Sequence, residues 1–267
     1  MRGTFDISCL KQPDGRTAVG RQVVSAPWHL SKPYWDDAVL LVQAVNATAG
    51  IFSGDTLDFR IHVESGASVL LTSPSASKIY TMPQGEAALN QTITVQRDGW
   101  LEWMPELFIP QRGSRYRQRT EVKVEPGGSL FMVETLAPGR VAHGESFAFD
   151  RVEWMTRIHH GERLVLAERY PLTPADASLS DLNHQPPWYY AGAVLIWDAP
   201  LPWRSWQECL SNGQHADLHM GATQVAESVY LFRMLARGSA ILKDGLRLIR
   251  EFGAQHIPPL SRSARKL

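Results

Sequence analysis

Two carboxylates stand at matching positions in the sequence, each seven residues after a glycine in a turn-like segment. Glu134 follows Gly127, and Glu168 follows Gly161. If these segments stack as repeated units, the two carboxylates occupy equivalent places in neighbouring layers. Carboxylates spaced in this way can hold a divalent cation weakly and pass it from one to the next. Because a buried carboxylate without a partner is costly, the pattern also predicts a wet interior.

Two other roles fit the same acidic residues. A pair such as Glu102 and Glu134 could supply the acid and the base of a carbohydrate-active β-helix enzyme. Alternatively, Glu134 or Glu168 pairs with Arg140 or Arg169 and is structural. The sequence leaves these alternatives open.

Common catalytic and metal-binding motifs are absent from the sequence. Neither G-x-x-x-x-G-K-[ST] nor G-x-G-x-x-G occurs, which argues against a P-loop NTPase or a Rossmann enzyme. The segment 144–148 approaches a nucleophile elbow but has alanine in place of the second glycine. His215 and His219 could share a metal on a helix, but no Glu follows His215, and a solvated helix face is the expected role. We expect no catalytic centre and no stable metal site.

Three arginines alternate along one segment, so their side chains should project from one face of a strand. They are Arg115, Arg117 and Arg119. Such a row often protects a solvated sheet edge. The functional alternative is a docking stripe for an acidic partner.

The elements that must position these residues are strands joined by glycine turns. From Leu57 to Val63 every second residue is apolar, which is the period of a half-buried strand. The unit of strand, turn and strand occurs four times, and its turn glycines are Gly66, Gly99, Gly127 and Gly161. They are 33, 28 and 34 residues apart, a spacing typical of stacked supersecondary units. We therefore predict an all-β fold with a few helices, built of stacked strand pairs and close to a β-helix or a layered β-sandwich. The unequal steps leave irregular hairpins in a plain sandwich as the alternative.

The composition changes beyond Pro171, where proline and tryptophan become frequent. We expect one domain over 1–267, with a repeated β body over 1–171 and a Pro/Trp-rich flank over 172–267. Within the flank, the sequence predicts a helix from Trp203 to Leu210 that ends at Asn212-Gly213, and a strand from Val229 to Phe232.

The last predicted element is a helix from Ala240 to Phe252 with one apolar face. Ser239 is the expected N-cap, and Gly253 is expected to end the helix.

Composition excludes several classes of protein. The 267 residues contain 27 Lys and Arg against 27 Asp and Glu, so a general polyanion binder, and with it nucleic acid as partner, is not expected. No apolar run is long enough to span a membrane, and no signal peptide is evident, which predicts a cytoplasmic protein. Cys9 and Cys209 are too isolated to form a disulfide framework.

Seven short motifs, in order from about Trp28 to Arg169, resemble the urease accessory proteins of the UreD type, also called UreH. They are Leu30–Pro33, Ala49–Asp55, Leu70–Tyr80, Leu101–Glu106, Glu134 with Gly139-Arg140, Gly144–Phe147 and Leu164–Arg169. Each motif alone is weak, but seven in register are specific. The motif residues that we single out are Gly50, Gly54, Lys78, Tyr80, Glu102, Arg140 and Glu145.

The resemblance implies a protein without enzymatic activity. Members of that family bind apo-urease together with UreF and UreG partners and take part in loading nickel into its active site. The resemblance also implies a β-rich fold with a few helices, no stably bound cofactor and nickel only in transit. An interaction module without a metal role is the remaining alternative.

Family positions on an internal water-filled tunnel, a proposed nickel route, match Asp55, Ser77, Glu134 and Glu168. Asp55 could equally tighten a turn, and the Ser77 side chain could form a hydrogen bond to the backbone. The sequence departs from the family pattern at Ala49, Ser53 and Thr81, and the usual Pro-Arg-Ile-Trp ending is absent. At Ala49 and Ser53 the family usually has glycine, so the turn should be less permissive.

Overall fold

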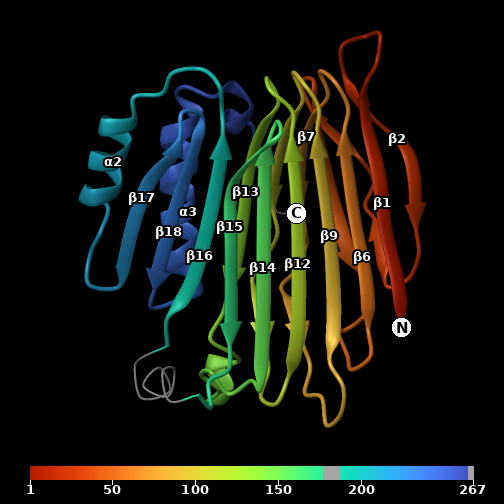
Figure 1. Ribbon diagram of the computed structural model, residues 1–267, viewed down its shortest axis with the longest axis vertical. Coiled ribbons are helices and arrows are strands. Elements are labelled where there is room, and N and C mark those ends of the chain that lie inside the picture. Colours follow the sequence, from red (N-terminus) through yellow and green to blue (C-terminus); the bar gives the residue numbers. More distant parts are fainter. Residues whose placement is uncertain (177–186, 264–267) are drawn as a thin grey trace.

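Two β-sheets face each other and form most of the molecule, as the computed structural model shows for residues 1–176 and 187–263 (Figure 1). The seven-stranded sheet contains, in spatial order, β15 (Arg163–Leu172), β14 (Arg151–His160), β12 (Arg115–Val124), β9 (Ala87–Val95), β6 (Thr56–Val63), β1 (Arg2–Lys11) and β2 (Thr17–Val24).

The eleven-stranded sheet has a main path and three short side strands. The path is β17 (Leu218–Ala226), β18 (Val229–Ala236), β16 (Tyr189–Ile196), β13 (Ser129–Leu136), β10 (Trp100–Met104), β7 (Ser68–Thr72), β5 (Val39–Asn46) and β3 (Trp28–Leu30). The side strands are β4 (Tyr34–Asp36), β8 (Ser77–Ile79) and β11 (Phe108–Pro110).

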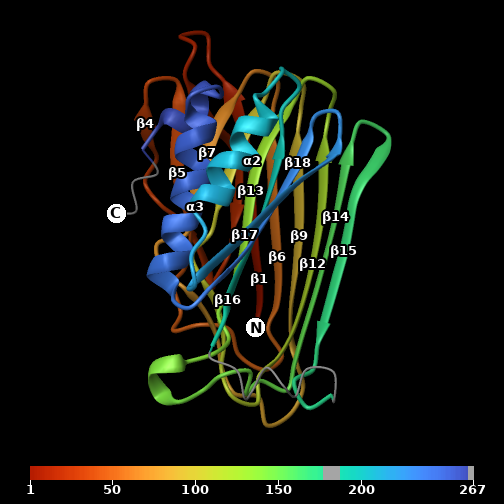
Figure 2. The same ribbon diagram turned by 90° about the vertical axis from the view of Figure 1, so that its left-hand side faces the viewer.

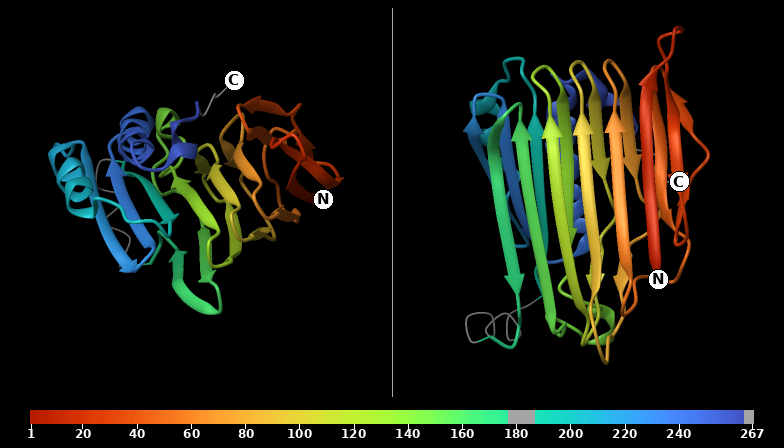
Figure 3. Two further views of the ribbon diagram at one scale, coloured as in Figure 1. Left: turned by 90° about the horizontal axis from the view of Figure 1, so that it is seen from above. Right: turned by 45° about the vertical axis from the view of Figure 1, so that its right-hand side comes forward.

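The chain passes from one sheet to the other at the predicted glycine turns. Strands β6, β9, β12 and β14 are parallel neighbours in the seven-stranded sheet, and β7, β10 and β13 are parallel neighbours in the other sheet. Four residues join β6 to β7, β9 to β10 and β12 to β13. Each turn therefore closes one coil of a β-helix, and the two layers are visible from above (Figure 3). The predicted stacking is confirmed, and the hairpin alternative is wrong for these three units.

The fourth unit differs from the prediction. Only Gly161 and Glu162 separate β14 from β15, and these strands pair antiparallel in the same sheet. A two-residue connection makes a hairpin, whereas the four-residue turns allow the chain to cross between the sheets. Glu134 on β13 and Glu168 on β15 thus belong to opposite sheets, so the prediction that they occupy equivalent positions is wrong.

Alternating side chains fill the space between the sheets with apolar groups. Phe5, Phe59 and Trp103 stack there, with ring centroids 4.9 and 5.1 Å apart. Such burial of apolar surface is the main stabilising contribution to a fold of this kind.

Two helices cover the outer face of the eleven-stranded sheet (Figure 2). They are α2 (Trp203–Asn212) and α3 (Ser239–Ala254). Trp206 is fully buried and packs on Phe232 and Phe252 at centroid distances of 5.1 and 5.3 Å. The tryptophan-rich flank therefore builds a second apolar layer behind the sheet.

Both predicted helices are present and slightly longer than expected, and the predicted strand extends from Val229 to Ala236. The predicted cap is wrong by one residue, because Gly238 is the N-cap and Ser239 is already helical. The expected helix face at His215 and His219 is also wrong. His215 lies in the turn after α2, and His219 lies on β17.

Gly50 lies where two loops meet so closely that a side chain would not fit. An ideal Cβ there would be 2.4 Å from the Lys78 carbonyl oxygen and 2.7 Å from the Tyr80 ring. We expect Gly50→Ala to lower the free energy of unfolding by about 1–3 kcal/mol through overpacking, as measured by urea denaturation. Gly221→Ala on β17 is the control, because no heavy atom lies within 4 Å of its Cβ position. Equal stability of the two variants would contradict this assignment.

Candidate functional site: a polar cavity between the sheets

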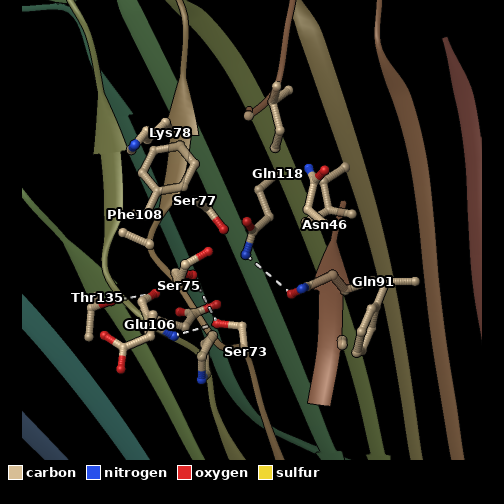
Figure 4. Close-up of a pocket in the computed structure, with 18 of the residues that line it drawn as sticks. Asn46, Ser73, Ser75, Ser77, Lys78, Gln91, Glu106, Phe108, Gln118 and Thr135 are labelled. Carbon is tan, nitrogen blue, oxygen red and sulfur yellow. Dashed lines mark hydrogen bonds between the residues drawn. The ribbon is translucent and has the colours of Figure 1, made fainter. Parts of the chain in front are cut away.

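A cavity of about 300 Å³ lies between the two sheets, near the loops that follow β5, β7 and β10 (Figure 4). Its wall includes aromatic rings, among them Trp28, Phe59, Trp103, Phe108, Tyr116 and Trp154. Polar side chains interrupt this lining, namely Asn46, Thr48, Ser73, Ser75, Ser77, Lys78, Gln91, Glu106, Gln118, Glu134 and Thr135. The cavity surface is thus mainly apolar, with a minority of polar groups that could bind water or an ion.

An amide and hydroxyl network crosses the seven-stranded side of the cavity. The Gln118 side-chain amide donates to Gln91 Oε1 at 3.2 Å (Figure 4). Thr120 Oγ1 donates to the same oxygen at 2.9 Å, and the Tyr116 hydroxyl donates to Gln118 Oε1 at 3.0 Å. All of these residues are buried, so their mutual hydrogen bonds offset the cost of removing polar groups from water.

These residues were not identified from the sequence, although a signal exists. Leu89, Gln91 and Ile93 all point inward from β9, so the glutamine interrupts an apolar row. Gln118 and Thr120 interrupt the inward row of β12 in the same way.

Glu134 extends from the eleven-stranded sheet into the cavity and bonds to the opposite sheet. Its Oε1 accepts hydrogen bonds from Trp154 Nε1 at 2.8 Å and from Thr156 Oγ1 at 3.0 Å. Burial raises the pKa of Glu134, while the two donors oppose that rise by stabilising the carboxylate. A cation that binds this carboxylate must displace the proton from it. Cation binding should therefore become weaker as the pH falls.

Glu168 lies one strand beyond Thr156 and forms an ion pair across the sheets. Thr156 on β14 and Glu168 on β15 are register partners. Arg233 Nη2 on β18 donates to Glu168 Oε1. The sequence-based pairings were wrong, because Arg140 binds Glu145 and Arg169 binds Glu153.

The remaining two tunnel candidates lie in different settings. Ser77 lines the cavity and points toward Gln118 (Figure 4). Asp55 is not among the lining residues, and its carboxylate accepts the Phe52 amide at 2.8 Å and pairs with the Met1 amino group at 2.5 Å. The structure thus places Ser77 and Glu134 on one cavity, Glu168 next to it and Asp55 in the turn before β6.

The acidic pair of the carbohydrate-active alternative does not exist. Glu102 is fully buried on the helix-covered face of the eleven-stranded sheet, where Arg250 Nε donates to it at 2.6 Å. Glu134 projects from the other face of the same sheet. Two carboxylates separated by a sheet cannot act on one glycosidic bond.

Other motif residues hold the loops around the cavity. Gly54 has a φ of 78°, which favours glycine, and Tyr80 stacks on Phe52 at 4.7 Å. Among the described residues, those with positive φ do not include Ala49 or Ser53. The departures from the family pattern therefore introduce no backbone strain, contrary to the expectation of a less permissive turn.

Arg115, Arg117 and Arg119 do share one face of β12, but β12 lies inside the seven-stranded sheet between β9 and β14. The edge-protection interpretation is therefore wrong. Arg115 pairs with Asp150 at 2.9 Å and Arg117 with Glu86 at 3.1 Å, and Arg119 is exposed.

No group of three or more His, Cys, Asp or Glu side chains that could hold a metal ion occurs within residues 1–176 and 187–263. Over the same part of the chain, no helix is long and apolar enough to cross a membrane.

Acid is expected to weaken the fold partly through Glu145. Hydrogen bonds from Arg140 hold the pKa of Glu145 below its ordinary value of 4.5. The stabilisation is therefore complete above about pH 4.5 and is lost as the pH falls through the lower, folded-state pKa. In Arg140→Gln, we expect a smaller loss of stability between about pH 6 and about pH 3 than in wild type, as measured by urea midpoints. Parallel pH profiles of the two proteins would refute the assignment.

Comparison with known proteins agrees with these observations. The family model described as UreD urease accessory protein matches residues 1–265. A urease accessory protein UreD from Opitutus terrae is 38% identical over 260 residues, covering 95% of this chain and 94% of the relative. UreD from Halalkalibacterium halodurans is 29% identical over 250 residues, covering 92% and 91%. UreH from Helicobacter pylori is 25% identical over 232 residues, covering 85% of each chain. Accessory proteins of this family are non-catalytic maturation factors, and the present chain belongs to the UreD urease accessory protein family.

Proposed function

We propose that this protein takes part in nickel delivery to apo-urease by offering the ion a polar route between its two sheets. The observation that carries the proposal is a continuous row of polar side chains on four neighbouring strands. Each member of the row is the register partner of the next one on the adjacent strand, in the order Gln91, Thr120, Thr156 and Glu168. At the usual strand spacing, three steps span roughly 14 Å.

Glu134 completes this row from the opposite sheet. Its hydrogen bond to Thr156 places a carboxylate beside the row. The side-chain oxygens of Gln91 and Ser77 border the same cavity. Oxygen ligands of this kind can replace part of the hydration shell of a divalent cation without holding it permanently. Multiple weak sites favour passage over storage.

Asp55 and Glu168 are proposed as carboxylates at the two ends of this route. Asp55 follows Ile51, which lines the cavity, by four residues. Glu168 lies on β15, the edge strand of the seven-stranded sheet, and its side chain is 20% exposed. We infer that nickel is cargo in this protein and is not a resident cofactor.

The proposed partners are apo-urease and accessory proteins like UreF and UreG, and the proposed location is the cytoplasm. The arginine row on β12 supports contact with an acidic partner, because Arg119 lies exposed on the open outer face of the sheet. Charges on such a surface raise the association rate and improve specificity.

Copurification tests the partner assignment. Affinity-tagged protein should recover apo-urease from cells that express the complete urease gene set. The charge variant Arg119→Glu should recover less, whereas Arg247→Glu on the exposed face of α3 should recover the normal amount. If the tagged wild-type protein recovers no urease, the scaffold role is wrong. If it recovers urease but nickel content does not depend on the chain, the interaction-module alternative is correct.

A further inference from the structure

The ion pair between Arg233 and Glu168 lies at the end of the polar row, where it links the two sheets. Arg233 is on β18 and its register partner on β16 is Gly192, which in turn faces Glu134 on β13. The Arg233 side chain is 28% exposed and that of Glu168 is 20% exposed. The pair therefore stands between the interior and the solvent.

Gly192 provides the space for this arrangement. A Cβ at Gly192 would lie 2.7 Å from the Tyr190 hydroxyl and 3.3 Å from Arg233 Nη1. Because Gly192 has no side chain, the Arg233 guanidinium can lie over β16 and reach Glu168 on the opposite sheet.

Within the part of the chain that the structure describes, three hydrogen bonds hold the guanidinium in this position. Arg233 Nη1 donates to the Phe232 carbonyl at 2.8 Å and to the Ala193 carbonyl at 3.4 Å, and Nη2 donates to Glu168. The carbonyl of Phe232 belongs to the neighbouring residue of the same strand. Glu168 is the charged partner that draws the side chain across the gap.

The charge of this side chain opposes the proposed cargo. Arginine remains protonated in proteins, so Arg233 brings a permanent positive charge to the end of the row. It repels a divalent cation, and it occupies the carboxylate that such an ion would need. An open route requires the guanidinium to move away from Glu168.

We propose that Arg233 is a movable positive gate that closes the polar row at Glu168. The physiological meaning of the gate rests on the proposed nickel route, but its effect on cation binding is a property of the isolated chain. An acidic side chain of a docking partner can open the gate by competing with Glu168 for the exposed part of the guanidinium.

Equilibrium dialysis of the purified full chain against Ni²⁺ tests the gate. Arg233→Gln should bind nickel about fivefold or more tightly than wild type, because the positive charge is gone and Glu168 is released beside Glu134. Arg233→Lys keeps the charge and should remain close to wild type. In Arg233→Gln combined with Glu168→Gln, the gain should disappear.

Thermal unfolding identifies variants that fail to fold, and Arg233→Met then serves as a second neutral replacement. Independently, Glu168→Gln alone leaves the guanidinium without its partner and should bind no more nickel than wild type. Equal nickel affinity of wild type and the neutral Arg233 variants would overturn the gate. That result would leave the proposed function untouched, because the latter is judged by the nickel content of urease.

Discussion

Arg250→Met is expected to lower the free energy of unfolding by about 3–5 kcal/mol, since it leaves the buried Glu102 carboxylate without its charge partner. Arg250 on α3 donates to Glu102 at 2.6 and 3.2 Å, and it also donates to the Arg262 carbonyl. Glu102 is 0% exposed, so water cannot replace these bonds. Urea denaturation of the full chain measures the loss.

Acidification should reduce this loss. Burial raises the pKa of Glu102, against the effect of Arg250, so the orphaned carboxyl can take up a proton as the pH falls and avoid the cost of a buried charge. The double variant Glu102→Met, Arg250→Met should recover most of the stability, because it removes both charges. Arg247→Met is the control on the same helix. Its side chain is 64% exposed, and its loss should stay within about 0.5 kcal/mol. An equally large loss of stability in this control, or no loss in Arg250→Met, would contradict the stabilising role assigned to the ion pair between Arg250 and Glu102.

The combined variant Asp55→Ala, Glu134→Gln, Glu168→Gln is expected to lower the nickel content of urease about tenfold or more, with the complex still assembled. Each single change should have a smaller effect, because a route of several weak sites tolerates the loss of one. Metal analysis of urease purified from cells that carry each variant measures the effect.

Exposed carboxylates provide the matched control. Asp58→Ala, Glu121→Gln and Glu251→Gln together change the formal charge by the same amount, and their side chains are 37%, 50% and 67% exposed. This control should deliver the normal amount of nickel. If the interior variant also delivers the normal amount, these three carboxylates do not carry the ion. If its complex does not form, their role is structural.

Much of the β-helix could be predicted because its signals are local. Alternating apolar residues define strands such as β6, and the turn at Gly66 has a φ of 71°, which favours glycine. The hairpin of β14 and β15 could not be predicted from the turn glycine alone, because the length of the connection depends on where the two strands end and begin. A two-residue connection at Gly161 changes the sheet to which all of β15 belongs.

The candidate site was only partly predictable. Ser77 and Glu134 were identified through their family positions, and both line the cavity. The partner of Glu168 is Arg233, which lies 65 residues away in the sequence and on the opposite sheet. Ion pairs of this kind depend on how strands from different sheets face each other. The spacing of residues along the sequence does not predict this arrangement.

The nickel content of urease in cells lacking this protein tests the central claim most directly. Urease should be produced in its usual amount but contain nickel close to background, and restoring the wild-type gene should return the metal. Nickel per urease active site is the quantity to measure, because it separates metal delivery from urease synthesis. Fully loaded urease in cells without this chain would contradict the proposal that the protein takes part in nickel delivery.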